Sequence, residues 1–227
     1  MCGRFTSLLS PELLAAIREL FGVPVPEAAE PRYNIAPTQN VWVVRNAGDH
    51  NRLELMKWGL VPFWAKDPAI GSQMINARCE TVAGKPAFRQ AIKLRRCIVP
   101  AAGFYEWAPP AVEGGRRQPL YIHMADASLM CFAGLWEQWK RPGEEGFLES
   151  FTIITTKANE LVSPLHDRMP VILRPNDFCM WLSHNMHDPE QLRGMYQPFP
   201  ADLLEAFKVS DLVNNVRFDS PACIARV

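Results

Sequence analysis

The chain has 227 residues, 48% of them hydrophobic, with 7 Trp and 12 Phe, so it can bury a substantial core. Lys plus Arg and Asp plus Glu each number 24, and this zero net charge excludes a uniformly basic nucleic-acid coat but not a local patch. Residues 1–120 hold 15 basic and 10 acidic side chains, whereas residues 121–227 hold 9 and 14. The densest basic run, 85–96 (KPAFRQAIKLRR), contains Arg89. It is either a solvated helix face or an edge that binds phosphates.

The first predicted element is a helix that begins after Ser10 and ends at Gly22. Ser10 is a typical N-cap, Pro11 suits the first turn, and apolar residues then follow at helical spacing. Gly22 is the residue type that most often ends a helix. Shorter helices are predicted further along the chain, at 85–93, 175–183 and 200–207.

Strand-like runs occupy much of the rest of the chain. They lie at 40–46, 52–60, 95–107, 118–125, 129–139 and 150–156. The linkers 108–118 and 140–149 are rich in Gly, Pro and charged residues and are predicted as hairpin loops. Because strands do not alternate regularly with helices, we expect one α+β domain over residues 1–227. Its core is predicted to be a curved, largely antiparallel, barrel-like sheet with a few peripheral helices.

The cysteine and histidine positions argue against metal binding. Six cysteines stand at 2, 79, 97, 131, 179 and 223, and no two have the spacing of a zinc site. His184 and His187 could form a metal pair, but a surface loop is the favoured interpretation. We therefore expect no metal and no cofactor. The first apolar stretch, LLAAIRELF, is too short for a signal sequence, so we expect a cytoplasmic protein without disulfides and without a membrane segment.

Cys2 directly follows the initiator methionine. Methionine aminopeptidase removes Met1 before a small residue, and the mature chain would then begin with a 1,2-aminothiol. Its amine and thiol have ordinary pKa values of about 7.7 and 8.5, so both are partly in the nucleophilic form near neutrality. Such a group condenses with an aldehyde through a Schiff base to a five-membered thiazolidine. By position alone, an idle terminal cysteine is the simpler interpretation.

Glu106 lies in the apolar run VPAAGFYEWA. On a continuous strand it would share a face with Ile98, Ala102 and Phe104, and a carboxylate in that company is desolvated. Desolvation raises a carboxyl pKa and suits the group to proton transfer near neutrality. The alternative is a glutamate at a fraying strand end that faces water.

Two further stretches carry candidate polar residues. In SPLHDRMPVIL, His166 precedes Asp167 and Arg168 in a predicted loop, where a working histidine is common, although a structural role is commoner for any single histidine. In MINARCET, Asn76 and Arg78 are two apart and would face one side of a strand. An asparagine can donate and accept hydrogen bonds, and an arginine can bind a phosphate. A turn is the alternative for this stretch.

These stretches together resemble the SOS response-associated peptidase (SRAP) family. The resemblance covers MCGRF, PRYNIAPTQ, WGLVPFWAKD, MINARCET, KPAFRQ, RRCIVPAAGFYEW, ITTKAN, LHDRMPVIL and VNNVRFDSP. The chain lacks long tails and so resembles the compact bacterial form of the family. So many motifs in one order make a chance match improbable.

The resemblance implies a DNA-repair function. Family members bind single-stranded DNA at abasic sites, link Cys2 to the ring-opened sugar as a thiazolidine, and so shield the site from strand cleavage. Cys2 resembles the nucleophile, Asn76 the residue that positions the amine and the sugar, Glu106 the proton shuttle, and His166 the group that assists Schiff-base chemistry. Arg4 and Arg78 resemble phosphate contacts, and Pro37 and Trp64 resemble parts of the DNA groove. Arg89, in the basic run, is a further expected DNA contact.

Two other functions remain open at this stage. One is an N-terminal-nucleophile hydrolase or autopeptidase, in which Cys2 attacks an amide and its own amine acts as base. The other is a single-strand-binding module in which Cys2 is incidental. The family resemblance also implies an activity that removes Met1, and leaves open a lyase activity or reversal of the crosslink. The expected partner is single-stranded DNA with abasic sites, bound by a monomer.

Overall fold

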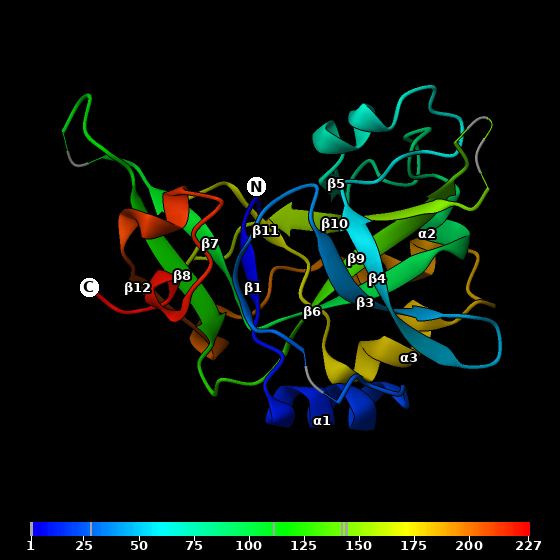
Figure 1. Ribbon diagram of the computed structural model, residues 1–227, viewed down its shortest axis with the longest axis horizontal. Coiled ribbons are helices and arrows are strands. Elements are labelled where there is room, and N and C mark those ends of the chain that lie inside the picture. Colours follow the sequence, from blue (N-terminus) through cyan, green and yellow to red (C-terminus); the bar gives the residue numbers. More distant parts are fainter. Residues whose placement is uncertain (1, 28, 111, 142, 144) are drawn as a thin grey trace.

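The computed structural model describes residues 2–27, 29–110, 112–141, 143 and 145–227. Its strands form two layers, a closed five-stranded barrel and a five-stranded antiparallel sheet, which lie side by side in Figure 1. The α+β class and the barrel-like core predicted from the sequence are therefore confirmed. No helix in the described part of the chain is long and apolar enough to cross a membrane.

The barrel closes in the order β10-β4-β3-β6-β9, with β9 pairing back onto β10. Its strands are β3 (Asn40–Asn46), β4 (Asn51–Trp58), β6 (Arg96–Ala101), β9 (Met130–Trp139) and β10 (Leu148–Lys157). Two short strands extend it along β10, namely β5 (Asn76–Arg78) and β11 (Arg168–Pro170). The pairings of β10 with β4 and with β5 are parallel, and the others described in the barrel are antiparallel.

The second sheet has the order β12-β8-β7-β1-β2 and is antiparallel throughout. Its strands are β1 (Phe5–Ser7), β2 (Arg32–Ile35), β7 (Gly103–Ala108), β8 (Gln118–Met124) and β12 (Leu204–Lys208). The N-terminal strand β1 therefore lies inside a sheet, between β2 and β7 (Figure 1). Pairing on both sides fixes the first residues of the chain, which in many proteins are unconstrained.

Phe5 connects the two layers. Its side chain is fully buried, and its ring lies 4.9 Å from that of Trp58 on β4 and 5.9 Å from that of Phe132 on β9, both edge to face. Aromatic pairs in this arrangement stabilise a core by about 1 kcal/mol beyond the area they bury. The segment that carries Cys2 is therefore anchored in the barrel core three residues further on.

Helix α1 (Pro11–Phe21) has the bounds that the sequence predicts. The Ser10 hydroxyl accepts from the amide of Leu13, and Gly22 adopts φ 64°, in the left-handed region that favours glycine. The other helices are short: α2 (Ala91–Leu94), α3 (Phe178–Leu182) and 3₁₀ turns at Pro68–Gln73, Pro175–Asp177, Pro189–Tyr196, Ala201–Leu203, Asp211–Asn214 and Pro221–Cys223.

Three sequence predictions need correction. The run 95–107 is two strands in different layers, because the chain leaves the barrel after β6 and enters the second sheet as β7. The predicted helix at 200–207 is a 3₁₀ turn followed by β12, because residues 204–208 pair with β8. The helix predicted at 85–93 is reduced to α2. By contrast, the helix predicted at 175–183 is confirmed, because the 3₁₀ turn Pro175–Asp177 runs directly into α3.

The two predicted hairpin loops are confirmed by the antiparallel pairing of the strands that flank them, β7 with β8 and β9 with β10. Residue 111 of the first loop and residues 142 and 144 of the second lie outside the described part.

Candidate functional site

Cys2 is completely buried where the sheet meets the barrel. Burial, and secondly the negative charge of Glu106, raise the pKa of its thiol far above the ordinary value. A 3.0 Å hydrogen bond from the Tyr105 amide to the Arg4 carbonyl brings the strand of Glu106 to the segment of Cys2, although 104 positions separate the two residues in sequence. The predicted removal of Met1 concerns a residue outside the described part of the chain.

Asn76 holds the backbone of Cys2. Its Nδ2 donates a 2.8 Å hydrogen bond to the Cys2 carbonyl. The residue lies on β5, whose parallel register with β10 places it opposite Ile153, so the strand and not a turn positions its side chain. Its Oδ1 is buried and has no hydrogen-bond partner among the described residues. A buried amide oxygen in this state can accept a hydrogen bond from a ligand at little cost.

Glu106 is on β7 and only 5% exposed, which decides between the two alternatives left by the sequence. Desolvation raises the pKa of its carboxyl to about 7. The cause of this burial is not the predicted one, a continuous strand on which Glu106 shares a face with Ile98. Ile98 lies on β6 of the barrel, whereas Glu106 lies on β7 of the second sheet. Burial between the layers gives the carboxyl group the property that proton transfer at neutral pH requires.

His166 lies on the loop before β11 and is partly buried. Its Nδ1 accepts from the amide of Arg168 at 3.0 Å and lies 2.8 Å from Oδ1 of the exposed Asp167. Burial lowers the pKa of the ring, against the opposing effect of Asp167. The amide of Arg168 is fixed in the backbone and needs a lone pair on Nδ1, whereas the carboxylate of Asp167 is largely exposed to water. The amide contact therefore favours the neutral tautomer with the proton on Nε2.

The side chain of Arg168 fixes this loop. Its guanidinium binds both oxygens of Glu80, at 3.1 and 2.9 Å, and donates to the carbonyl and the hydroxyl of Thr155 on β10. One buried side chain thus joins the segment after β5 to β10 and β11. Because the amide of the same residue contacts His166, these bonds also set the position of the histidine ring.

The five predicted DNA contacts differ in how they are held. Arg4 donates through one guanidinium nitrogen to Asn34 and to the carbonyl of Val213, each at 2.6 Å, so part of its side chain is structural. Arg78 and Arg89 are exposed. Pro37 is half-buried in the turn after β2, and Trp64 is 47% exposed. None of these arrangements tests DNA binding, and the five contacts stay predictions.

One basic residue near the site is missing from the sequence-based set. Arg117 stands just before β8, and its positive charge lowers the pKa of both Glu106 and His166. Three residues after it, Leu120 of β8 pairs with Glu106 of β7. In the sequence Arg117 falls in a predicted hairpin loop, and the two adjacent positive charges of Arg116 and Arg117 are the one local feature that indicates a role.

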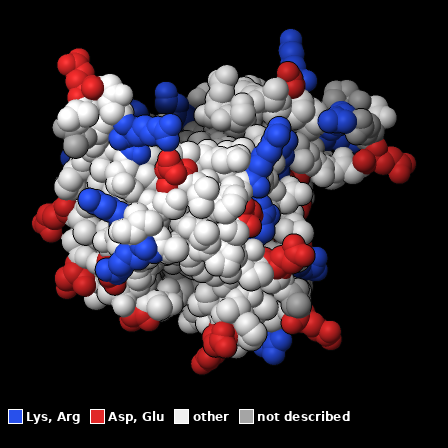
Figure 2. Space-filling model, turned by 60° about the vertical axis from the view of Figure 1, so that its left-hand side comes forward, with Lys and Arg blue, Asp and Glu red and all other residues white. Residues whose placement is uncertain are grey.

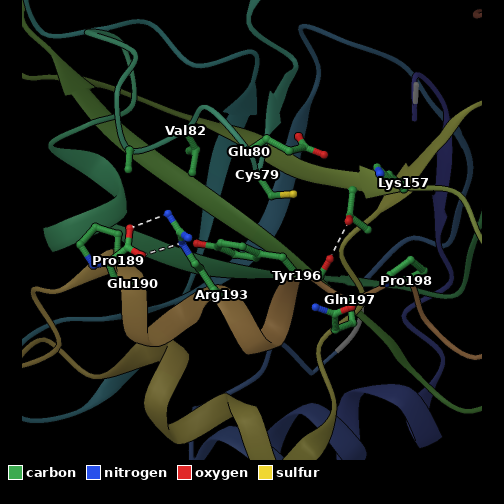
Figure 3. Close-up of a pocket in the computed structure, with 12 residues that line it drawn as sticks. Cys79, Glu80, Val82, Lys157, Pro189, Glu190, Arg193, Tyr196, Gln197 and Pro198 are labelled. Atoms are coloured by element: carbon green, nitrogen blue, oxygen red, sulfur yellow. Dashed lines mark hydrogen bonds and ion pairs between the residues drawn. The ribbon is translucent and has the colours of Figure 1, made fainter.

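A cavity of about 480 Å³ opens beside the segment that follows β5 (Figure 3). Cys79 and Glu80 line one side of it, and Arg193, which pairs with Glu190, lines the other. The predicted residues Cys2, Asn76, Glu106 and His166 do not line this cavity.

Charges are mixed on the face that Figure 2 shows, where basic and acidic side chains are separated by uncharged surface. His184 and His187 lie on the segment after α3, and no group of three or more metal-ligating side chains forms within the described ranges.

The architecture recurs in solved structures. A crystal structure of a protein from Bacteroides thetaiotaomicron superposes with a TM-score of 0.86 over 100% of both chains, at 24% sequence identity. At this identity the likeness concerns the fold alone. A barrel joined to a second sheet that holds the N-terminal residues is therefore an established fold class.

The family model for SOS response associated peptidase (SRAP) matches residues 1–216. The chain therefore belongs to the SRAP family, as its motifs predict. It is 44% identical to the abasic site processing protein YoqW of Bacillus subtilis, over 99% of each chain. It is 31% identical to the abasic site processing protein YedK of Escherichia coli, over 96% of each.

Proposed function

We propose that this protein processes abasic sites by binding single-stranded DNA and linking itself covalently to the open sugar through Cys2. Relatives that match nearly the whole chain bear the name of abasic site processing proteins. The observation that carries the proposal is the position of Cys2. Its carbonyl accepts a hydrogen bond from Asn76, and its segment is bonded through Arg4 to Tyr105, the neighbour of Glu106. Neither the Asn76 amide nor the buried Glu106 carboxyl group is needed simply to pack an N-terminal segment against the barrel.

The proposed chemistry begins once Met1 is removed, because only then is the amine of Cys2 free. The amine adds to the C1′ aldehyde of the ring-opened sugar, and the adduct loses water to give an imine. The thiol sulfur then bonds to the imine carbon, and its proton passes to the nitrogen. The products are one thiazolidine and one water, and no oxidant or reductant is needed.

Glu106 and His166 have distinct parts in this scheme. A carboxyl group with a pKa of about 7 is present in both forms at neutral pH, so it can accept a proton from the thiol and return it to the nitrogen. This help matters because burial leaves the thiol with little tendency to ionise by itself. His166, with its proton on Nε2, can donate a hydrogen bond to an oxygen of the opening sugar.

Asn76 and the basic residues complete the proposal. The buried Oδ1 of Asn76 can accept from the amine of Cys2 or from a sugar hydroxyl. Arg4, Arg78 and Arg89 are proposed to bind phosphates, and Pro37 and Trp64 to contact the bases next to the abasic site. We further propose that the protein acts as a cytoplasmic monomer that becomes associated with damaged DNA.

A hydrolase is the second candidate function. A terminal amine and thiol beside a carboxyl group that titrates near neutrality also fit an N-terminal-nucleophile hydrolase. Turnover separates the two functions, because a hydrolase releases product repeatedly from an amide substrate whereas a crosslinking protein is consumed.

The deciding experiment mixes purified protein with single-stranded DNA that holds one abasic site and separates the products under denaturing conditions. Intact-mass measurement first establishes that Met1 is absent. We expect a species whose mass is the sum of protein and DNA less one water. Cys2→Ala should abolish it, whereas Cys179→Ala, which alters an exposed cysteine on α3, should leave it unchanged. An equal yield from Cys2→Ala would rule out the proposed chemistry.

A further inference from the structure

An open groove of about 630 Å³ runs beside the β7–β8 hairpin on the face of the second sheet that is turned away from the barrel. It is bounded on one side by the hairpin and on the other by the 3₁₀ turn Asp211–Asn214. In Figure 1 these C-terminal residues, orange to red, lie near β7 and β8. The lining residues are Trp107, Arg116, Arg117, Asp211, Leu212, Asn214 and Asn215.

An aromatic side chain and an apolar side chain are held in this groove. The indole nitrogen of Trp107 donates to Oδ1 of Asn214 at 2.7 Å, which fixes the ring, and the ring also packs 6.5 Å from that of Tyr105. Leu212 is 42% exposed beside it. A fixed, partly exposed indole offers a face on which an unpaired base can stack without further ordering of the side chain.

The charge of the groove is positive. Arg116 lies 3.1 Å from Asp211, but both side chains are largely exposed, so water screens the pair and the arginine can exchange partners at little cost. Arg117 is exposed and has no acidic partner among the described ion pairs. The lining therefore carries two positive charges against one negative charge.

Arg117 connects the groove to the candidate site. It lines the groove, and three residues later Leu120 of β8 pairs with Glu106 of β7. Trp107 follows Glu106 on β7, and neighbouring side chains of a strand point to opposite faces. Glu106 and Trp107 therefore face opposite sides of the second sheet, and Arg117 stands at the loop end of the hairpin that carries them.

We infer that this groove binds the DNA strand that flanks the abasic site, with Arg116 and Arg117 on phosphates and Trp107 under a base. The inference rests on the proposed function. Single-stranded DNA has phosphates that can bind the two arginines and unpaired bases that can stack on the fixed indole ring. Double-stranded DNA lacks the unstacked bases that this ring would contact. The groove thus extends the binding site around the end of the hairpin and gives the protein a preference for single-stranded flanks.

The test measures binding of full-length protein to oligonucleotides that carry a tetrahydrofuran abasic analogue, which has no aldehyde and cannot crosslink. One oligonucleotide is short, and two others extend it on the 5′ or the 3′ side only. The double variant R116Q/R117Q is compared with R193Q/R226Q, whose two arginines are exposed, pair with glutamates and do not line the groove. W107L tests stacking, and thermal unfolding shows that each variant is folded.

We expect one of the two extensions to tighten binding by the wild-type protein. R116Q/R117Q should bind this extended oligonucleotide roughly tenfold more weakly than the wild-type protein does. The slope of log K against log salt should fall by about 0.7 for each phosphate that an arginine no longer neutralises. W107L should lose roughly tenfold without a change of slope. R193Q/R226Q should keep the gain.

Two results would overturn the inference alone, provided that wild-type protein still crosslinks authentic abasic DNA. The first is that neither extension increases the affinity of the wild-type protein. The second is that R116Q/R117Q gains as much affinity from the extension as the wild-type protein does. If wild-type protein neither binds nor crosslinks any of the oligonucleotides, the proposed function fails and the inference fails with it.

Discussion

The side-chain amide of Asn76 donates a 2.8 Å hydrogen bond to the backbone carbonyl of Cys2, across 74 positions of sequence. This contact joins β5, an extension of the barrel, to the segment before β1 of the second sheet. The segment that carries Cys2 is thus held from both layers. Removing the donor should free the Cys2 backbone while leaving the sheets intact.

We expect Asn76→Ala to slow crosslinking about fivefold, because one hydrogen bond to a reacting segment contributes roughly 1 kcal/mol. Single-turnover kinetics on abasic DNA would measure this. Asn46→Ala removes an asparagine hydrogen bond at the end of the β3–β4 hairpin and serves as the control. Equal rates for wild type and Asn76→Ala would show that this contact has no part in the reaction.

The raised pKa of Glu106 predicts a pH dependence of stability. Its carboxyl group has a pKa of about 7 in the fold and about 4.3 in an unfolded chain, so the protonated form is the one the fold favours. This contribution is complete below about pH 4.3 and is lost as the pH rises through 7. Glu106→Gln should therefore raise the free energy of unfolding above pH 7 and flatten its dependence between pH 4.5 and 7, as urea titrations can show.

The same group predicts a pH dependence of rate. Crosslinking by wild-type protein should show an inflection near pH 7 that is missing in Glu106→Gln. Non-covalent binding to DNA with a tetrahydrofuran site should remain near the wild-type value in this variant. A large loss of affinity instead would mean that Glu106 is structural.

The bond between Glu80 and Arg168 predicts sensitivity to acid. Burial opposes ionisation of Glu80, but the hydrogen bonds from Arg168 prevail and hold its pKa below the ordinary value. A depressed pKa contributes stability above the unfolded value of about 4.3, and that contribution is lost as the pH falls through the folded value. Glu80→Gln should therefore be less stable than wild type at pH 7 and lose less stability on acidification.

The matched control for Glu80→Gln is Glu190→Gln, which alters an exposed pair with Arg193 in the same cavity. We expect the control to change stability by under about 1 kcal/mol at any pH. Nitrogen NMR of His166 adds a second measurement. A proton on Nε2 in wild type, with the tautomers mixed in Glu80→Gln, would agree with the role of Arg168 in holding the ring.

Arg4 and Arg78 should respond differently to substitution. Arg78→Gln alters an exposed side chain, so we expect weaker DNA binding, a smaller salt slope and little change in unfolding. Arg4→Gln also removes hydrogen bonds to Asn34 and Val213 and should lower stability by about 1 to 3 kcal/mol. Chemical denaturation beside an anisotropy titration separates the two effects.

Arg96 is a buried arginine whose guanidinium binds only backbone carbonyls among its described contacts, at the ends of α2 and α3. The acceptors are the carbonyls of Ile92, Lys93, Trp181 and Ser183. Burial lowers its pKa to about 10. Arg96→Met leaves these carbonyls without a partner and should cost about 3 kcal/mol or more in urea titrations. The exposed Arg226→Met should cost little, and similar losses in both would contradict this account.

Much of the fold follows from local sequence. The bounds of α1 are predicted because Ser10 and Gly22 act on the adjacent backbone, whatever lies further away. The strands β3 and β4 are likewise predicted by their patterns of apolar residues. By contrast, residues 200–207 have a helical pattern, but residues 204–208 form a strand because they pair with β8. The pairing of these residues with β8 decides their structure, and the local sequence does not indicate which strand they pair with.

The sequence by itself determined which groups are available: a cysteine behind the initiator methionine, together with Asn76, Glu106 and His166 in motifs that identify the family. Only the tertiary structure decided their properties. Burial between two layers sets the pKa of Glu106 near 7, and the parallel pairing of β5 with β10 brings Asn76 to Cys2. Desolvation and through-space contact depend on segments distant in the chain, and so they arise only when barrel and sheet pack together.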